Sequence, residues 1–330
     1  MTKGFNMRKI LVTGGLGLIG KHLIKQLLAA GDCSVFIVDD ESTSIMDRYN
    51  EKNLANSAVT FYQGTVDNFF YSHNATFDEI YHLAAPVGPV GVLKHTGTIA
   101  TEILKDLSQV TSIALEADAK LMFISTSEVY GQNPVFDQPE DIDKIVPPIY
   151  TVRLEYGVAK LLGEIVLSNI ARKHPIRHFV VRPFNITGPG QNSELGFVLP
   201  RFIKQALSGE PITVYGDGSS KRTFTHVDDF ASGIVKIMAS DFYGGIFNVG
   251  NPNNVITIGE MAREIKRLCY SNSEIIFIDP TTLHGKDFAE AWNKIACIDK
   301  MKSMLGWTPV IPLETVLVDC IEYERNILSK

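Results

Sequence analysis

The sequence alternates short apolar runs with longer amphipathic stretches, and this alternation constrains the fold more than any other feature. Apolar runs of strand length lie at residues 8–13, 34–40, 58–62, 79–84, 120–125 and 177–182. Helical patterns separate them, most clearly at about 100–117 and 151–172. Strands that alternate with helices form βαβ units, whose strands run parallel and are covered on both faces. The sequence therefore predicts an α/β protein with a doubly wound parallel sheet.

The chain changes character after residue 185. Glycine and proline cluster at residues 188–190 and 216–218, and the predicted elements become shorter. A length of 330 residues fits one large domain or two joined domains. We predict a first domain over residues 1–185 that carries the sheet, and a smaller, mixed domain over residues 186–330 that exchanges some segments with it. A ligand cleft is expected between the two.

Composition and charge exclude several classes of protein. With 45% hydrophobic and 21% charged residues the chain is of the globular type, and no apolar run approaches the ~20 residues that span a bilayer. A formal net charge of −6 without a basic block speaks against a nucleic-acid partner. The four cysteines are scattered and the histidines lack metal-ligand spacing, which favours reduced thiols and no metal site. We expect a cytoplasmic protein with no membrane partner.

A glycine-rich turn, TGGLGLIG, joins the first strand to the first helix at residues 13–20. Gly14 allows the tight turn, Gly17 lets a pyrophosphate approach the backbone, and Gly20 lets the helix pack closely on the strand. Asp39 ends the second strand, where a carboxylate accepts hydrogen bonds from a ribose 2′-hydroxyl and repels a 2′-phosphate. This pattern predicts a Rossmann-type site for NAD; the alternative is a structural turn with solvated acids.

The strand at residues 120–125 ends in a polar cluster that includes Thr126, Ser127 and Glu128. The tips of parallel strands are where ligands bind, so the cluster suggests chemistry. A polar cap on the following turn is the alternative, because Ser, Thr and Glu are typical of helix starts.

Tyr156 and Lys160 are four residues apart within a helical pattern, which places both side chains on one face, about 5–6 Å apart at Cβ. A phenol with a pKa near 10 is a poor base at neutral pH. A nearby ammonium together with a positive nicotinamide stabilises the phenolate, so we expect a lowered pKa for Tyr156. In isolation the spacing occurs by chance in many helices, but here it follows a nucleotide motif and a polar strand tip.

Further segments occur in a fixed order along the chain: HLAA (82–85), STSEVYG (125–131), YGVAK (156–160), RPFNITGPG (182–190), VYGDGSSKRTFTHVDD (214–229), FNVGNP (247–252) and LGWTP (305–309). Together with TGGLGLIG and Asp39 they resemble the extended short-chain dehydrogenase/reductase family that acts on nucleotide sugars, from residue 8 to about 320. The resemblance implies an NAD-dependent epimerase, 4,6-dehydratase or decarboxylase. It also implies that Tyr156 removes the C4 hydroxyl proton while NAD takes the C4 hydride.

The resemblance further implies a role for each matching residue. Thr126 is expected to bond the C4 oxygen, Lys160 the nicotinamide ribose, and Glu128 to face C5. The expected cofactor contacts are Gly14, Gly17, Leu18, Ile19, Gly20, Asp39, Asp40, Thr65, Val66, Leu83, Ala84, Ala85, Tyr156, Lys160 and Pro183. The expected substrate contacts are Pro86, Thr126, Glu128, Asn185, Val198, Leu199, Tyr215 and Arg222. Plain core packing is the alternative for Val198, Leu199 and Tyr215.

The residue types favour one reaction among three. Simple 4-epimerases usually carry a small residue at the position of Glu128, and most dehydratases carry Asp at that of Ser127. GDP-mannose dehydratases share Thr-Ser-Glu but favour NADP, which Asp39 opposes. UDP-glucuronate decarboxylases resemble STSEVYG best and share a proline-containing loop similar to APVGP (85–89). The prediction is decarboxylation of a UDP-glucuronate-type sugar; a 4-epimerase, a 4,6-dehydratase and a non-catalytic NAD(H)-binding module are the alternatives.

The chemistry fits a decarboxylase. Oxidation at C4 makes a β-keto acid, which loses carbon dioxide readily without a metal. Glu128 with Ser127 is expected to protonate C5, and Arg222 to hold the carboxylate or the pyrophosphate; binding of the pyrophosphate alone is the alternative for Arg222.

Three segments depart from the family pattern. Thr65 stands where the family usually has an Asp near the adenine, and TEILKD (101–106) stands in place of Asn-x-x-Gly-Thr. NKIACID (293–299) stands in place of Arg-Pro-Asp, so a substrate with a base other than uracil is a further alternative.

The helices at 100–117 and 151–172 carry apolar stripes, the second formed by Leu154, Val158, Leu161, Leu162 and Ile165. The family pairs such helices in a homodimer; stripes that simply cover the sheet are the alternative.

Overall fold

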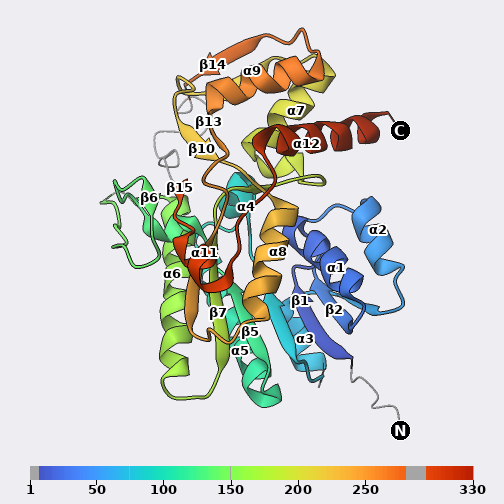
Figure 1. Cartoon of the computed structure of the whole chain (residues 1–330), viewed down its shortest axis with the longest axis vertical. Helices are drawn as coiled ribbons and strands as arrows, with labels where there is room; N and C mark the ends of the chain where they lie inside the picture. Colours follow the sequence, from blue (N-terminus) through green and yellow to red (C-terminus); the bar gives the residue numbers. More distant parts are fainter. Residues whose placement is uncertain (1–6, 74, 149, 280–294, 330) are drawn as a thin grey trace.

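A seven-stranded, entirely parallel sheet forms the centre of the larger part of the molecule (Figure 1). The computed structural model describes residues 7–73, 75–148, 150–279 and 295–329. The strand order is β12-β7-β5-β4-β1-β2-β3. The strands are β1 (Arg8–Thr13), β2 (Cys33–Asp39), β3 (Val59–Gln63), β4 (Glu79–His82), β5 (Lys120–Ile124), β7 (Arg177–Pro183) and β12 (Gly245–Val249). The predicted α/β fold is confirmed.

The strand order reverses between β1 and β4, and this reversal fixes where a ligand can bind. The chain proceeds outward from β1 to β2 and β3, then returns to β4 on the other side of β1. Connections on opposite faces leave a crevice at the carboxyl ends of the two central strands. The glycine turn after β1 and the HLAA segment after β4 therefore meet at this point.

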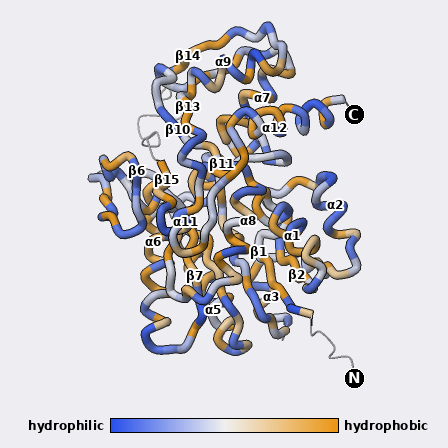
Figure 2. Tube along the Cα trace, viewed as in Figure 1, coloured by the Kyte–Doolittle hydropathy of each residue, from blue (hydrophilic) through white to orange (hydrophobic). Residues whose placement is uncertain are grey.

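Helices cover both faces of the sheet. One face is covered by α1 (Leu18–Ala30), α8 (Val227–Met238) and α11 (Asp299–Leu305), and the other by α3 (Val66–Ser72), α5 (Ile99–Ala117) and α6 (Val152–Ala171). Figure 2 shows hydrophobic stretches along β1 and β2, and the residues of β1 from Ile10 to Val12 are fully buried. Each face thus has its own apolar core, which is why the strands read as continuous apolar runs.

A smaller lobe lies beyond the carboxyl ends of the strands (Figure 1). It contains α7 (Val198–Ser208), α9 (Ile258–Cys269) and α12 (Leu313–Leu328), with the strand pairs β9 (Ile212–Tyr215) with β14 (Ile275–Ile278) and β10 (Lys221–Thr223) with β13 (Val255–Thr257). These elements share a third apolar cluster. The boundary at residue 185 stays a prediction; α8 and β12 come from beyond it and pack with the sheet.

Short elements complete the fold. They are α2 (Arg48–Leu54), α4 (Gly88–Lys94), the 3₁₀ turns η1 (Ser127–Tyr130) and η2 (Ser193–Leu195), and the paired strands β8 (Ile186–Thr187) with β11 (Thr225–His226) and β6 (Asp137–Gln138) with β15 (Ile295–Ala296). The four cysteines carry free thiols. Within the described residues no helix is long and apolar enough to cross a membrane. Across the same ranges, no group of three or more His, Cys, Asp or Glu side chains is placed to hold a metal ion.

Candidate active site

The glycine turn after β1 has the geometry that a dinucleotide needs. Gly14 has a left-handed backbone (φ 69°), and a Cβ there would lie 2.9 Å from the amide nitrogen of Ala84. A Cβ on Gly20 would lie 2.5 Å from the carbonyl oxygen of Gly14. Gly17 differs, because a Cβ there would meet nothing closer than that same oxygen, at 3.3 Å. The backbone at Gly17 is therefore open on its outer side, and Leu18 and Ile19 begin the helix behind it.

Asp39 links the end of β2 to this turn. Its Oδ2 accepts a hydrogen bond from the amide of Leu16 at 3.0 Å, and its Oδ1 accepts one from the amide of Glu41 at 2.8 Å. Burial raises the pKa of Asp39, and these two hydrogen bonds act in the opposite direction. A carboxylate has about four lone-pair sites, so it can still accept from a ribose. Asp40 instead binds the amide and hydroxyl of Ser42 in its own loop.

The neighbouring strand ends close the nucleotide side of the crevice. The amides of Leu83 and Ala84 bond to Thr13, and Ala85 and Pro86 continue the chain from there. Thr65 caps α3, because its hydroxyl accepts a hydrogen bond from the amide of Asn68 at 3.1 Å.

Val66 is the first residue of α3 and is buried, whereas Pro183 ends β7 and is half-buried. Contacts of the residues at these strand ends with a cofactor remain predictions.

Thr126 and Tyr156 are brought together although they lie thirty residues apart in the chain. Thr126 follows β5, Tyr156 lies near the start of α6, and their hydroxyl groups are hydrogen-bonded. The Thr126 hydroxyl also accepts a hydrogen bond from the amide of Glu128 at 3.2 Å, so it caps η1 as well. The capping interpretation and the chemical one are therefore compatible at this residue.

Lys160 lies one helical turn beyond Tyr156 and is only 2% exposed. Its Nζ donates to the carbonyl oxygen of Ile124 at 2.8 Å and lies 4.8 Å from the centre of the Phe123 ring. Burial lowers the pKa of Lys160 to about 7, against the charges of Asp106 and Glu164.

The lowered pKa expected for Tyr156 stays a prediction, because it depends on a bound nicotinamide as well as on Lys160. Burial raises that pKa, the hydrogen bond from Thr126 lowers it, and the charge of Glu128 raises it further. The ammonium of Lys160 is directed to the backbone of β5 instead of to the phenol. Lowering of the phenol pKa therefore requires a positive charge from outside the chain, such as that of a nicotinamide.

Glu128 stands at the same strand tip and is paired with Arg153. The Arg153 Nε donates to Oε2 of Glu128 at 2.9 Å, and its Nη2 lies 3.5 Å from Oε1. Ser127 precedes Glu128 and is buried. Sequence reasoning missed Arg153, although its position three residues before Tyr156 places it on the same helix face and is a usable signal.

A buried ion pair behind the strand tip was also missed. Arg182 binds Glu164 through Nε at 2.9 Å and Nη2 at 2.6 Å, and the Ser125 hydroxyl donates to Glu164 at 2.5 Å. Arg182 and Glu164 are 2% and 4% exposed. The pair links β7 to α6, and through the hydroxyl of Ser125 it also holds the residue that precedes Thr126.

His82, at the tip of β4, is a further buried polar residue. Its Nδ1 is 2.8 Å from the Thr13 hydroxyl, while its Nε2 has no hydrogen-bond partner among the described residues. Burial and the charge of Lys160 lower its pKa to about 3. His82 is therefore neutral at physiological pH and supports the strand end without adding charge.

The residues expected to bind the sugar nucleotide lie around the junction of the two lobes. Asn185 is exposed in a left-handed conformation (φ 43°), which Asn tolerates better than most residues. Val198 begins α7, whose first turn has no side-chain cap and so leaves backbone N–H groups available. The guanidinium of Arg201 lies 4.0 Å from the centre of the Tyr215 ring. Arg222 lies on β10, and its Nη1 donates to the carbonyl oxygen of Lys221.

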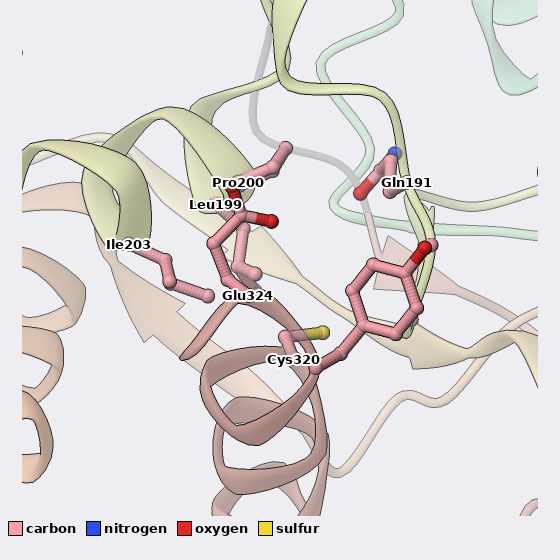
Figure 3. Close-up of a pocket in the computed structure, with 9 residues that line it drawn as sticks. Gln191, Leu199, Pro200, Ile203, Cys320 and Glu324 are labelled. Atoms are coloured by element: carbon pink, nitrogen blue, oxygen red, sulfur yellow. The ribbon is translucent and has the colours of Figure 1, made fainter. Parts of the chain in front are cut away.

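Leu199 packs in the core of the small lobe, in agreement with the core-packing alternative for its side chain. It also lines a small pocket between α7, α12 and the segment after β8, where its neighbours include Gln191, Cys320 and Glu324 (Figure 3). The cavity volume is about 10 Å³, about enough for one water molecule. This pocket is too small for a sugar. Of the segment NKIACID, residues 293 and 294 lie outside the described residues.

The fold and this constellation define a Rossmann-type enzyme with a tyrosine, a lysine and a polar strand tip at the nucleotide crevice. The NAD dependent epimerase/dehydratase family matches residues 10–250. The chain belongs to this family, so it is an enzyme and its cofactor is NAD. The open backbone at Gly17 and the carboxylate of Asp39 fit that cofactor.

Relatives and solved structures extend over nearly the whole chain. The chain is 33% identical over 309 residues to UDP-glucuronic acid decarboxylase 6 of Arabidopsis thaliana, covering 93% of this chain and 86% of the relative. It is 30% identical over 323 residues to UDP-N-acetyl-alpha-D-glucosaminuronate decarboxylase of Bacillus cytotoxicus, covering 97% and 98%. The crystal structure of UDP-glucuronic acid 4-epimerase from Bacillus cereus, in complex with UDP-glucuronic acid and NAD, superposes with a TM-score of 0.83 at 26% identity, covering 97% of this chain and 99% of that one.

Proposed function

We propose that this enzyme decarboxylates a UDP-glucuronate-type nucleotide sugar through a transient 4-keto intermediate. The observation that carries the proposal is the meeting of Thr126, Tyr156 and Glu128 at one strand tip beside the nucleotide crevice. The decarboxylases among the relatives support the reaction type, since both are named for substrates with an acidic sugar.

The reaction opens with removal of a proton from the C4 hydroxyl. A bound NAD would supply the acceptor for the C4 hydride and the donor for its later return. Tyr156 accepts the hydroxyl proton, while Thr126, hydrogen-bonded to Tyr156, orients the C4 oxygen. Lys160 lies one helical turn after Tyr156, and its hydrogen bond to the carbonyl oxygen of Ile124 holds the end of β5 in place.

Carbon dioxide then leaves from C5 of the β-keto acid. The bond between C5 and the carboxyl carbon breaks, its electron pair forms an enolate with the C4 carbonyl, and C5 must next gain a proton. Glu128, with Ser127 beside it, is the group at the strand tip that supplies this proton. The net reaction of the ionised acid consumes one proton for each carbon dioxide released.

A 4-epimerase is the second candidate, favoured by the likeness to the UDP-glucuronic acid 4-epimerase structure. The two reactions are distinguished by incubating the purified protein with UDP-glucuronate and NAD and following the nucleotide sugar by mass spectrometry. The proposal predicts loss of the mass of one carbon dioxide. An unchanged mass with an altered sugar proton spectrum means epimerisation instead.

We also propose a homodimer formed through the outer face of α6. Val158, Leu162 and Ile165 are 40%, 42% and 48% exposed, so they do not cover the sheet. A hollow of about 560 Å³, lined by apolar residues that include Val146 and Val152, continues this face. Light scattering should give twice the chain mass, and Leu162→Glu should give a monomer; a monomeric wild type at working concentration removes the proposal.

The free thiols support a reducing compartment, and we assign the enzyme to the cytoplasm on that basis. Fractionation of cells that express the protein with a small tag tests this assignment.

A further inference from the structure

The ion pair between Glu128 and Arg153 is placed at some local cost. Arg153 is the second residue of α6, in the first helical turn. The helix dipole disfavours a cation in that turn. The guanidinium nonetheless reaches η1 and binds both carboxylate oxygens of Glu128, at 2.9 Å and 3.5 Å. An arginine at this position is therefore better explained by its bond to Glu128 than by any benefit to the helix.

Arg153 is also well placed relative to the reacting carbons. It lies three residues before Tyr156, so both side chains project from one face of α6. The carboxyl carbon of a uronate is two bonds from C4, the carbon that carries the hydroxyl bound by Tyr156. A sugar held by Tyr156 and Thr126 thus presents its carboxylate close to the tip that Glu128 and Arg153 share.

Three other cations considered for this site have partners of their own in the described part of the chain. Lys160 is buried and donates to the backbone of β5, and Arg182 is bound by Glu164 behind the strand. Arg222 lies on β10 and donates to the carbonyl of Lys221. Arg153 is partly exposed, with a side-chain accessibility of 41%, so an anion from solvent can reach it.

Resting on the proposed function, we propose that Arg153 recognises the C6 carboxylate of the substrate by exchanging Glu128 for it. Two carboxylates then face one guanidinium. Like charges at short range disfavour two ionised carboxylates, so the displaced Glu128 takes up a proton from solvent. That proton is the one that C5 needs after carbon dioxide leaves. A substrate without the acid leaves Glu128 paired with Arg153, and the proton donor is not formed.

The exchange is tested in the NAD-loaded Tyr156→Phe variant, which is expected to bind sugar nucleotides without turnover. Calorimetric titration with UDP-glucuronate and with UDP-glucose, each in two buffers of different ionisation enthalpy, gives affinity and proton uptake. UDP-glucuronate should bind with proton uptake, and UDP-glucose with none. Adding Glu128→Gln should abolish the uptake.

Adding Arg153→Gln should lower the affinity for UDP-glucuronate by roughly 10- to 100-fold, the range of a charge-assisted hydrogen bond, and leave UDP-glucose within about twofold. Arg153→Lys should retain part of the preference. Arg172→Gln, at the far end of α6, is the matched control and should change neither ligand.

An unchanged preference in Arg153→Gln, or binding of UDP-glucuronate without proton uptake, overturns the exchange. If wild type still releases carbon dioxide, the proposed function survives that result. If wild type neither binds nor converts UDP-glucuronate, the proposed function fails, and the inference fails with it.

Discussion

The backbone of Glu128 lies directly against Gly157. A Cβ at position 157 would be 3.1 Å from the carbonyl oxygen of Glu128 and 3.3 Å from its Cβ. Glycine inside a helix costs about 1 kcal/mol relative to alanine, so its use here trades helix stability for close approach of η1 to α6. This contact places Glu128 of η1 next to Tyr156 of α6.

Gly157→Val should therefore separate catalysis from cofactor binding. The larger side chain must push η1 away from α6, and we expect kcat to fall at least about tenfold, because small displacements of reacting groups are costly. NAD affinity, measured by fluorescence titration, should remain within about threefold, since the glycine turn and Asp39 belong to other elements than η1 and α6. A wild-type kcat would show that the approach of η1 to α6 is unimportant.

Asp39 should control both affinity for the cofactor and its selectivity. Asp39→Ala removes the acceptor for a ribose hydroxyl and the partner of the Leu16 amide, so the KM for NAD should rise by roughly 10- to 100-fold. The preference for NAD over NADP should also weaken, because the repelling charge is gone. Asp241→Ala, which removes a carboxylate that accepts from the Tyr243 hydroxyl just before the edge strand β12, is the control and should change KM little.

Lys160 should make stability depend on pH. Burial lowers its pKa to about 7 in the folded protein from an ordinary value of 10.5. Between these values the unfolded chain binds the additional proton, so native stability should rise as pH increases from 7 towards 10.5. Lys160→Met removes this group, and its unfolding free energy in urea should increase less between pH 7 and 10 than that of wild type. Equal slopes contradict the shift.

The buried pair of Glu164 and Arg182 should be important for stability. Glu164→Gln leaves the buried guanidinium without its ionised partner, and breaking such a pair costs about 3–5 kcal/mol. Urea unfolding should show a loss of that size, and NAD affinity should fall little in the protein that remains folded. A loss below about 1 kcal/mol means that Arg182 finds another partner.

The parts of the site that follow from local backbone chemistry could be predicted from the sequence. The role of Gly20 depends on contacts within one βα unit, and its crowded surroundings agree with the spacing argument, whereas the crowding at Gly14 comes from Leu83 and Ala84 after β4. Tyr156 and Lys160 follow from helix periodicity. The parallel, doubly wound character of the sheet follows from the alternation of strands and helices.

The parts that depend on distant segments could not be predicted. The pairing of Arg153 with Glu128 requires the loop after η1 to bring the start of α6 back to the tip of β5. The pair of Glu164 and Arg182 requires α6 and β7 to pack side by side. The rise that burial causes in the pKa of Tyr156 could not be predicted from charges alone, because a single sequence does not show how deeply a side chain lies.

The most direct test of the proposed chemistry is the reaction of wild-type enzyme with UDP-glucuronate and NAD in D₂O, followed by mass spectrometry and proton NMR of the product. We expect a sugar that has lost one carbon dioxide and carries one deuterium at C5, delivered from the strand tip after the carboxylate leaves. A product of unchanged carbon content, or one that has lost carbon dioxide without gaining deuterium at C5, contradicts it.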